Sequence, residues 1–181
     1  MAVYISMLRG INVSGQKKIL MPELKALYEG LGFSKVITYI QSGNVIFETQ
    51  INDPLPALSS LIEKAISDGY GFSTPVILRT IEEMQAVIKA NPFIKDIGQV
   101  TEKLYVTFLD KEPALDSINR INPFDFLPDK FKFYNREIYL DCASGYGTTK
   151  LSNTFFENKL KVKATTRNWN TVNELLELAS L

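Results

Sequence analysis

The segment VITYIQSGNVIF, residues 36–47, decides the fold of the first half of the chain. Residues 36–40 and 45–47 are rich in β-branched and aromatic side chains, which favour strands. Between them, residues 41–44 (QSGN) combine the residue types that form turns. The segment therefore predicts a β-hairpin, the most clearly marked one in the sequence.

The elements around this hairpin predict a ferredoxin-like arrangement. Residues 3–8 form a short apolar run that predicts a strand, and Pro22 stands near the start of an amphipathic helix. After the hairpin, Pro54 opens a second helix and residues 75–78 predict a final strand. The resulting order β-α-β-β-α-β is that of the ferredoxin-like fold, and it assigns residues 1–80 to one α+β domain.

Residues 81–181 predict a second, smaller α+β domain that includes a helical connector over 81–100. Its expected elements are a strand, a short helix, a hairpin and a helix, over 104–109, 113–121, 131–140 and 152–160. A loop or short strand then precedes a last helix, which the capping box of Thr171 and Glu174 places from Thr171 onward. This order echoes the first half, but the residues show no convincing repeat, so duplication is left open.

The composition excludes several classes of chemistry. Twenty basic and twenty acidic residues balance, which argues against nucleic acid binding across the whole surface. The absence of histidine removes Ser-His-Asp and Cys-His catalysis and the commonest zinc ligand. Cys142 is the single cysteine, so no disulfide forms within the chain. Because no carboxylate cluster has ligand spacing either, no metal or cofactor is predicted.

The sequence also indicates where the protein resides. The N-terminus lacks the basic and then apolar pattern of a signal peptide. No apolar stretch approaches the ~18 residues that a membrane-spanning helix needs. We therefore expect a cytoplasmic protein without a membrane partner, and the sequence leaves its oligomeric state open.

The first stretch with possible chemistry is RGINVSGQKK, residues 9–18. It follows a strand, and its glycines let backbone N–H groups point toward an anion. The spacing of Gly10 and Gly15 is close to that of a P-loop, but Gln16 and Lys17 stand where the lysine and the Ser or Thr belong. Two interpretations remain: a connecting loop with solvated lysines, or a site for another anion or polar ligand.

The second stretch is SGYGTTK, residues 144–150, between a strand and a helix. Its glycines, hydroxyl groups and Lys150 suit an anion at a helix N-terminus. The alternative is a flexible connection without a ligand.

The third stretch is TTRNWNT, residues 165–171, ahead of the last helix. Arg167 could bind a carboxylate or phosphate through two parallel hydrogen bonds. Trp169 could pack against a ligand, although a single tryptophan is more often part of a core. Asn170 and Thr171 are expected to cap the helix.

Five stretches together resemble a known family: residues 8–15 (LRGINVSG), 21–24, 31–33 (LGF), 36–47 and 166–172 (TRNWNTV). They resemble the bacterial family called domain of unknown function 1697. The resemblance spans nearly the whole chain and is densest at its two ends. Ser14 departs mildly from the pattern, because the family often has glycine there.

This resemblance implies a ferredoxin-like N-terminal domain followed by a second α+β domain, in agreement with the pattern of the residues. It implies no reaction, because the activity of the family is not established. It directs attention to the positions of its motifs, which are Arg9, Gly10, Asn12, Ser42, Gly43, Asn44, Arg167, Asn168 and Trp169.

These residues favour a protein that binds a small anionic or polar ligand through loops bearing arginine, asparagine and glycine. In a ferredoxin-like sheet we expect the exit of the first strand and the turn at 41–44 to lie at opposite ends. The closing stretch could still join either of them. The decisive question is whether Arg9 and Arg167 line one cavity.

Two alternatives stay open. The first is a structural or protein-interaction module in which Arg167 and the asparagines brace the interface between the two halves, since no catalytic constellation is present. The second is a binder of single-stranded nucleic acid that uses aromatic residues on a sheet. The balance of charge argues against the second, because neutralised phosphates usually supply most of the affinity.

Overall fold

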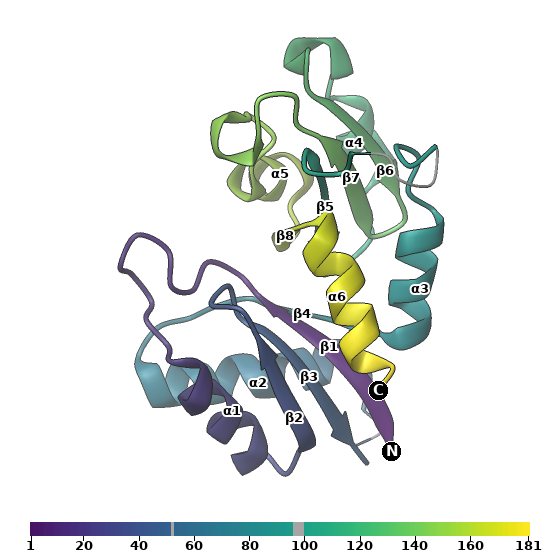
Figure 1. Cartoon of the computed structure of the whole chain (residues 1–181). Coiled ribbons are helices and arrows are strands. Elements are labelled where there is room, and N and C mark those ends of the chain that lie inside the picture. The colour runs from purple at the N-terminus through teal and green to yellow at the C-terminus, as the bar shows by residue number, and fades with distance from the viewer. Residues whose placement is uncertain (52, 96–99) are drawn as a thin grey trace. The chain divides into compact units, whose positions relative to one another are not determined.

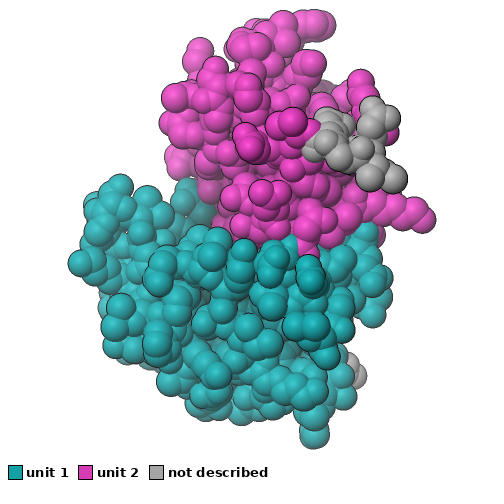
Figure 2. Space-filling view, viewed as in Figure 1, with its two compact units in different colours: residues 1–85, 174–181 teal, residues 86–173 magenta. Residues whose placement is uncertain are grey.

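Figure 1 shows the computed structural model of the chain, which describes residues 1–51, 53–95 and 100–181. The protein is α+β, and the described residues form two antiparallel four-stranded sheets and six α-helices. The chain divides into two compact units (Figure 2). Unit 1 consists of residues 1–85 and 174–181, and unit 2 consists of residues 86–173.

Unit 1 contains a sheet in the order β2-β3-β1-β4 and two helices packed on it. The elements are β1 (Ala2–Leu8), α1 (Met21–Gly30), β2 (Ser34–Tyr39), β3 (Asn44–Thr49), α2 (Leu55–Tyr70) and β4 (Val76–Thr80). β1 is antiparallel to both β3 and β4. The predicted hairpin at 36–47 is present as β2 and β3.

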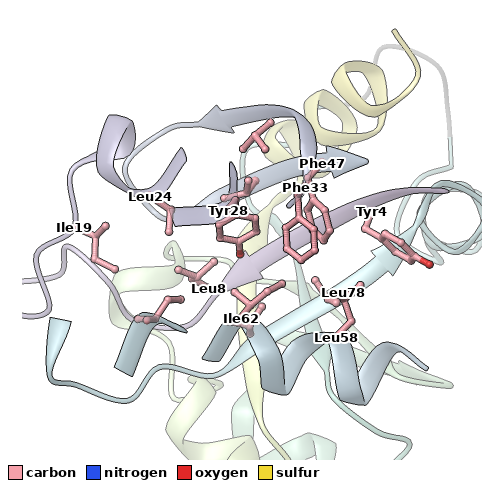
Figure 3. Close-up of a cluster of buried hydrophobic side chains, with 14 of the residues drawn as sticks. Tyr4, Leu8, Ile19, Leu24, Tyr28, Phe33, Phe47, Leu58, Ile62 and Leu78 are labelled. Carbon is pink, nitrogen blue, oxygen red and sulfur yellow. The ribbon is translucent and has the colours of Figure 1, made fainter. Parts of the chain in front are cut away.

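The core of unit 1 lies between the sheet and its helices (Figure 3). Leu58, Ile62 and Ile66 recur on one face of α2, and all three are buried, as helical periodicity requires. The rings of Phe33 and Phe47 stack with 4.4 Å between their centroids. Apolar burial of this kind supplies most of the driving force for folding.

Unit 2 repeats this architecture with a sheet in the order β6-β7-β5-β8. The elements are β5 (Leu104–Leu109), α4 (Leu115–Asn119), β6 (Lys130–Tyr134), β7 (Glu137–Asp141), α5 (Asn153–Leu160) and β8 (Ala164–Asn168). Short 3-10 turns occupy Pro123–Phe126 and Tyr146–Thr148. Its core contains edge-to-face contacts among phenylalanines, such as that between Phe131 and Phe156.

Each sheet is followed directly by a further helix. α3 (Ile81–Lys89) follows β4, and α6 (Trp169–Ala179) follows β8. The boundaries between the units fall within these two helices. Part of the connector expected over 81–100, residues 96–99, lies outside the described residues.

The sequence left the segment ahead of the last helix open as a loop or a short strand, and it is a strand, β8 (Ala164–Asn168). Thr165 and Arg167 lie on β8, where they pair with Phe108 and Val106 of β5. The start of the last helix that the capping box predicted at Thr171 is two residues late, because α6 begins at Trp169. The Asn168 Oδ1 accepts the Thr171 N–H over 2.8 Å, so asparagine caps the helix three residues before its expected start.

No helix among the described residues is long and apolar enough to cross a membrane.

Candidate functional site

The exit of β1 and the β2–β3 turn lie at the same end of the unit 1 sheet. The expectation that they lie at opposite ends is therefore wrong. Leu8 donates its N–H to the Gly43 carbonyl oxygen over 2.9 Å, and Met7 faces Asn44 in the strand register. β1 and β3 are antiparallel neighbours, so the last residues of β1 necessarily lie beside the first residues of β3.

The connection between α2 and β4 lies at the same end of the sheet. The Arg9 N–H donates to the Pro75 carbonyl oxygen over 2.9 Å, and the Thr74 hydroxyl donates to the Arg9 carbonyl oxygen over 2.9 Å. The Lys17 Nζ donates to the Ser73 carbonyl oxygen over 2.7 Å. We call residues 9–20, 40–43 and 72–75 the loop end of unit 1.

Asn12 ties two of these loops together. Its Nδ2 donates to the carbonyl oxygens of Ile19 and Gln41, over 2.9 Å each. Its Oδ1 accepts the Ile19 N–H over 2.9 Å. The backbone of Asn12 has a φ of 55°, a left-handed conformation that asparagine tolerates better than most residues. The side chain is thus engaged within the protein and fixes the path of the exit loop.

Asn44 does the same for the β2–β3 turn. It is fully buried, and its Nδ2 donates to the Tyr39 carbonyl oxygen and the Ser42 Oγ over 3.0 Å each. A buried amide needs such partners, because an unpaired one costs about 1–3 kcal/mol. Asn44 and Ser42 therefore shape the turn from within.

Gly43 allows the close approach between the turn and the exit loop. A Cβ at this position would lie 2.6 Å from Ile11 Cδ1 and 3.0 Å from Leu8 Cβ, and the φ of +79° is unfavourable for other residues. Further along the exit loop, Ser14 and Gly15 both have positive φ values, and the Gln16 N–H donates to the Val13 carbonyl oxygen over 2.9 Å. This is the geometry of a type I′ turn, which projects the loop as a small hairpin.

The loop end of unit 1 carries positive charge. Its ionisable residues are Arg9, Lys17 and Lys18, and none of its residues is a carboxylate. Arg9 is half-buried, whereas residues 13–18 are all exposed. The Lys17 ammonium lies 5.9 Å from the centre of the Phe72 ring, in a cation–π contact. One carboxylate borders these loops, since the Glu63 Oε1 accepts the Val76 N–H over 2.9 Å directly after the 72–75 loop. Three cations against this one carboxylate leave a surface on which an anion is electrostatically favoured.

In unit 2, Arg167 is buried within the strand that carries it. Its Nη1 donates to the Thr165 Oγ1 over 2.8 Å and to the Thr166 carbonyl oxygen over 2.9 Å. Burial lowers the pKa of Arg167 to about 10, so the guanidinium remains charged at neutral pH. Trp169 is buried with 7% of its surface exposed.

The 144–150 loop of unit 2 is braced by a carboxylate. Asp129 accepts the Ala143 N–H over 2.9 Å and the Thr149 hydroxyl over 2.5 Å. This negative charge makes the loop a poor anion site, although Lys150 is exposed. Burial and the nearby Asp129 raise the pKa of the Cys142 thiol to about 11, so this buried thiol is protonated at neutral pH.

Comparison with known proteins gives a family. Residues 1–139 match the family described as Protein of unknown function (DUF1697). The chain belongs to this family. A solved structure, described as that of the conserved bacterial protein SP0830 from Streptococcus pneumoniae, has a similar fold with a TM-score of 0.75 and 22% sequence identity. The similarity covers 98% of this chain and 98% of that one. No curated protein matches the sequence.

The DUF1697 match contains the whole loop end of unit 1 but not the motif at 166–172. At that loop end, the structure brings together two groups of motif residues that lie far apart in the sequence. The first group is Arg9, Gly10 and Asn12, and the second is Ser42, Gly43 and Asn44. The remaining four residues, Lys150, Arg167, Asn168 and Trp169, belong to unit 2.

Sequence reasoning missed two features of this DUF1697 protein. The sequence of the 72–75 loop has no motif that distinguishes it from an ordinary connection. It is nevertheless one of the three segments of the loop end. Arg79 on β4 was also overlooked, although it is 1% exposed and stands two residues before a helix, as Arg167 does. Among the described residues, no group of three Cys, Asp or Glu side chains could hold a metal ion.

Proposed function

We propose that the loop end of unit 1 binds a small anionic ligand. The observation that supports this most is its charge: Arg9, Lys17 and Lys18 stand on loops that contain no carboxylate, in a protein whose net charge is zero. The loops are held in place by side chains, so little conformational entropy is lost when a ligand binds.

In this proposal the residues have two kinds of role. Arg9, Lys17 and Lys18 contact the anion, and Lys17 keeps two ammonium protons beyond the one given to Ser73. The positive φ values at Gly10 and Gly15 let the backbone approach the ligand closely. Asn12, Ser42, Gly43 and Asn44 are positioning residues, since their side chains or backbone hold the loops.

The test is thermal unfolding in the presence of inorganic phosphate, nucleoside monophosphates, sugar phosphates and dicarboxylates. A ligand at 100 times its Kd should stabilise the protein by about 2.7 kcal/mol, which raises Tm by several degrees. Arg9→Ala and Lys17→Ala/Lys18→Ala should each reduce the shift, and high salt should weaken it.

Arg136→Ala/Lys163→Ala is the matched control, because it removes two cations from the corresponding end of unit 2. This control should leave the ligand-induced shift unchanged. If no anion raises Tm, or if the control loses the shift as completely as Lys17→Ala/Lys18→Ala, the proposal is wrong.

A second candidate function is a structural or protein-interaction module without a small ligand. It is favoured by the engagement of Asn12, Asn44 and Asn168 in hydrogen bonds within the chain. Here Arg167 serves stability, so Arg167→Ala should lower Tm markedly without altering any ligand-induced shift. An unchanged melting curve for Arg167→Ala would eliminate this role.

We further infer that unit 1 is ferredoxin-like. Its element order β-α-β-β-α-β and its sheet order β2-β3-β1-β4 support this description. A ferredoxin-like sheet hosts many unrelated functions, so the fold assigns no reaction to the protein.

A further inference from the structure

The two sheets pair their strands in the same register. Along β1 and β4, Tyr4, Ile5 and Leu8 face Thr80, Arg79 and Val76. Along β5 and β8, the corresponding partners are Tyr105, Val106 and Leu109 with Asn168, Arg167 and Ala164. The β1–β3 and β5–β7 pairs follow the same rule, since Tyr4 faces Phe47 and Tyr105 faces Leu140. One alignment of the two units, with gaps in the loops, therefore satisfies these two strand pairs in both sheets. The third pair matches only in part, because β2–β3 has a register shift between Ser34 and Ile37 that β6–β7 lacks.

The same alignment matches the hydrogen bonds at the strand ends. The N–H of Leu8 donates to the carbonyl oxygen of Gly43, and the N–H of Leu109 donates to that of Arg136, over 2.9 Å in both units. The next residue repeats the pattern: Arg9 donates to Pro75 over 2.9 Å, and Asp110 donates to Lys163 over 3.1 Å.

A carboxylate on the second helix of each unit caps the last strand. The Glu63 Oε1 on α2 accepts the Val76 N–H over 2.9 Å. The Glu157 Oε1 on α5 accepts the Ala164 N–H over 3.2 Å. Val76 and Ala164 are the first residues of β4 and β8, so the two carboxylates occupy corresponding places.

The junction between the last strand and its following helix is also repeated. The Nη1 of Arg79 donates to the Leu78 carbonyl oxygen over 2.8 Å, and the Nη1 of Arg167 donates to the Thr166 carbonyl oxygen over 2.9 Å. One residue later, a side-chain oxygen caps each helix three residues ahead. The Thr80 Oγ1 accepts the Glu83 N–H, and the Asn168 Oδ1 accepts the Thr171 N–H.

A shared topology explains the strand order but not these side-chain matches. Nothing in a ferredoxin-like sheet requires a glutamate on the second helix to reach the first amide of the last strand. Nor does it require a buried arginine followed by a capping residue at the end of that strand. We propose that unit 1 and unit 2 are copies of one module, β-α-β-β-α-β followed by a helix.

One difference between the copies lies where the proposed ligand binds. β1 ends at Leu8 and α1 begins only at Met21, whereas β5 ends at Leu109 and α4 begins at Leu115. At the first position after the strand, Arg9 of unit 1 corresponds to Asp110 of unit 2. The Asp110 Oδ1 accepts the Lys163 N–H over 2.8 Å. The exit segment 110–114 carries two carboxylates and one lysine, while the cations Arg136 and Lys163 of this end stand on the other two connections.

This difference assigns anion binding to unit 1 alone and makes the short, acidic exit of unit 2 the non-binding copy. The assignment rests on the proposed function, whereas the duplication does not. Accordingly, the two parts need separate tests.

The duplication is tested by exchange of the matched junction. Residues 79–85 (RTIEEMQ) are replaced by residues 167–173 (RNWNTVN), and the control carries the same seven residues in scrambled order at 79–85. The exchanged protein should unfold cooperatively with Tm lowered by less than about 8 °C. The scrambled protein should lose cooperative unfolding. Equal damage in the two proteins would overturn the duplication.

A milder exchange keeps the test decisive if the larger one fails to fold. Thr80→Asn places the capping residue of unit 2 in unit 1, and Thr80→Ala removes the cap. Thr80→Asn should keep Tm within about 2 °C of the parent protein, while Thr80→Ala should lower it by about 2–4 °C. A Tm loss for Thr80→Asn as large as that for Thr80→Ala would count against matched junctions.

The assignment to unit 1 is tested by charge exchange at the matched exits. Arg9→Asp should abolish the Tm shift caused by inorganic phosphate, and Asp110→Ala should leave that shift unchanged. Loss of the phosphate shift in Asp110→Ala would overturn the assignment to unit 1 without affecting the duplication. A phosphate shift retained in Arg9→Asp would overturn it as well.

Discussion

At the scale of single residues, the asparagines and glycines of the sequence motifs hold the loops of unit 1 in place. Asn12 and Asn44 each hold backbone carbonyls of a neighbouring segment, and Gly43 lets two segments approach where a Cβ would collide. These residues look like ligand contacts in the sequence because polar side chains and glycines in loops are common in binding sites. Their hydrogen bonds instead make them positioning residues.

Gly43→Ala should destabilise the protein by about 1–3 kcal/mol. The added methyl group would overlap Ile11 Cδ1, and the positive φ would strain the alanine. The free energy of unfolding from urea titration measures the effect. Gly30→Ala is the control, because no atom lies within 4 Å of its added Cβ and its φ is not positive. Equal stability of Gly43→Ala and the parent protein would contradict the close approach.

Tyr28→Phe should change both the stability and its dependence on alkaline pH. The Tyr28 hydroxyl lies 2.7 Å from the Ser6 Oγ in the core, so its loss should cost about 1–2 kcal/mol at pH 7. Burial raises the pKa of Tyr28 in the folded state above its ordinary value of 10.0. Below its ordinary pKa the phenol is neutral in both the folded and the unfolded chain. As the pH rises above that value, the phenol of the unfolded chain ionises while that of the folded chain stays neutral, so the stability of the folded state falls.

The measurement for Tyr28 is the free energy of unfolding between about pH 9 and 12. Tyr28→Phe should lose stability less steeply than the parent protein, by up to about 1.4 kcal/mol per pH unit. Ser6→Ala keeps the phenol and should keep the steep loss. Parallel curves for Tyr28→Phe and the parent protein would show that this phenol does not control the alkaline limit.

At the scale of elements, the exit loop of β1 is longer than its counterpart in unit 2, with 12 residues between β1 and α1 against 5 between β5 and α4. Local sequence marked it as a loop correctly, because glycine, asparagine and serine disfavour regular structure. The sequence did not predict which other loop lies beside it, because that depends on the antiparallel pairing of β1 and β3.

Asn12→Ala should loosen the exit loop without unfolding unit 1. It removes three hydrogen bonds of the Asn12 side chain and places alanine at a φ of 55°. Limited digestion with trypsin, which cleaves after Lys17 and Lys18, should become about ten times faster through local opening. Gln16→Ala in the same exposed loop should be cleaved at the parental rate. Equal rates for Asn12→Ala and Gln16→Ala would remove Asn12 from its bracing role.

β8 shows why the sequence could not decide between a loop and a short strand ahead of the last helix. Residues 164–168 lack the apolar alternation that marked the other strands, since four of the five are polar. They are nevertheless mostly buried, because β8 pairs with β5 along its whole length. The backbone groups of β8 are paired and its hydroxyls are hydrogen-bonded, as between Thr166 and Thr107. These hydrogen bonds offset the free-energy cost of burying polar groups.

At the scale of the whole molecule, each unit has a hydrophobic core of its own. Phe47 and Phe156 are fully buried members of different cores and share no packing partner within them. Phe47→Leu and Phe156→Leu should each cost about 1 kcal/mol.

The double variant Phe47→Leu/Phe156→Leu should lose the sum of the two single losses within about 0.5 kcal/mol, as expected for independent sites. Urea titration of all four proteins measures this. Phe33→Leu/Phe47→Leu is the coupled control, because the two rings stack and their losses should not add. A coupling of Phe47 with Phe156 as large as that of Phe33 with Phe47 would mean that the cores do not act separately.

The sequence by itself determined the order of most elements, the hairpin at 36–47, the exclusion of histidine chemistry and the positive charge of residues 9–18. These depend on local patterns of neighbouring residues. Only the tertiary structure decided that the loops at 9–20, 40–43 and 72–75 meet, that residues 164–168 form a strand, and that the two units match. Those features are set by pairing between strands far apart in the sequence, which depends on long-range backbone hydrogen bonds and shared burial and leaves little trace in any local pattern.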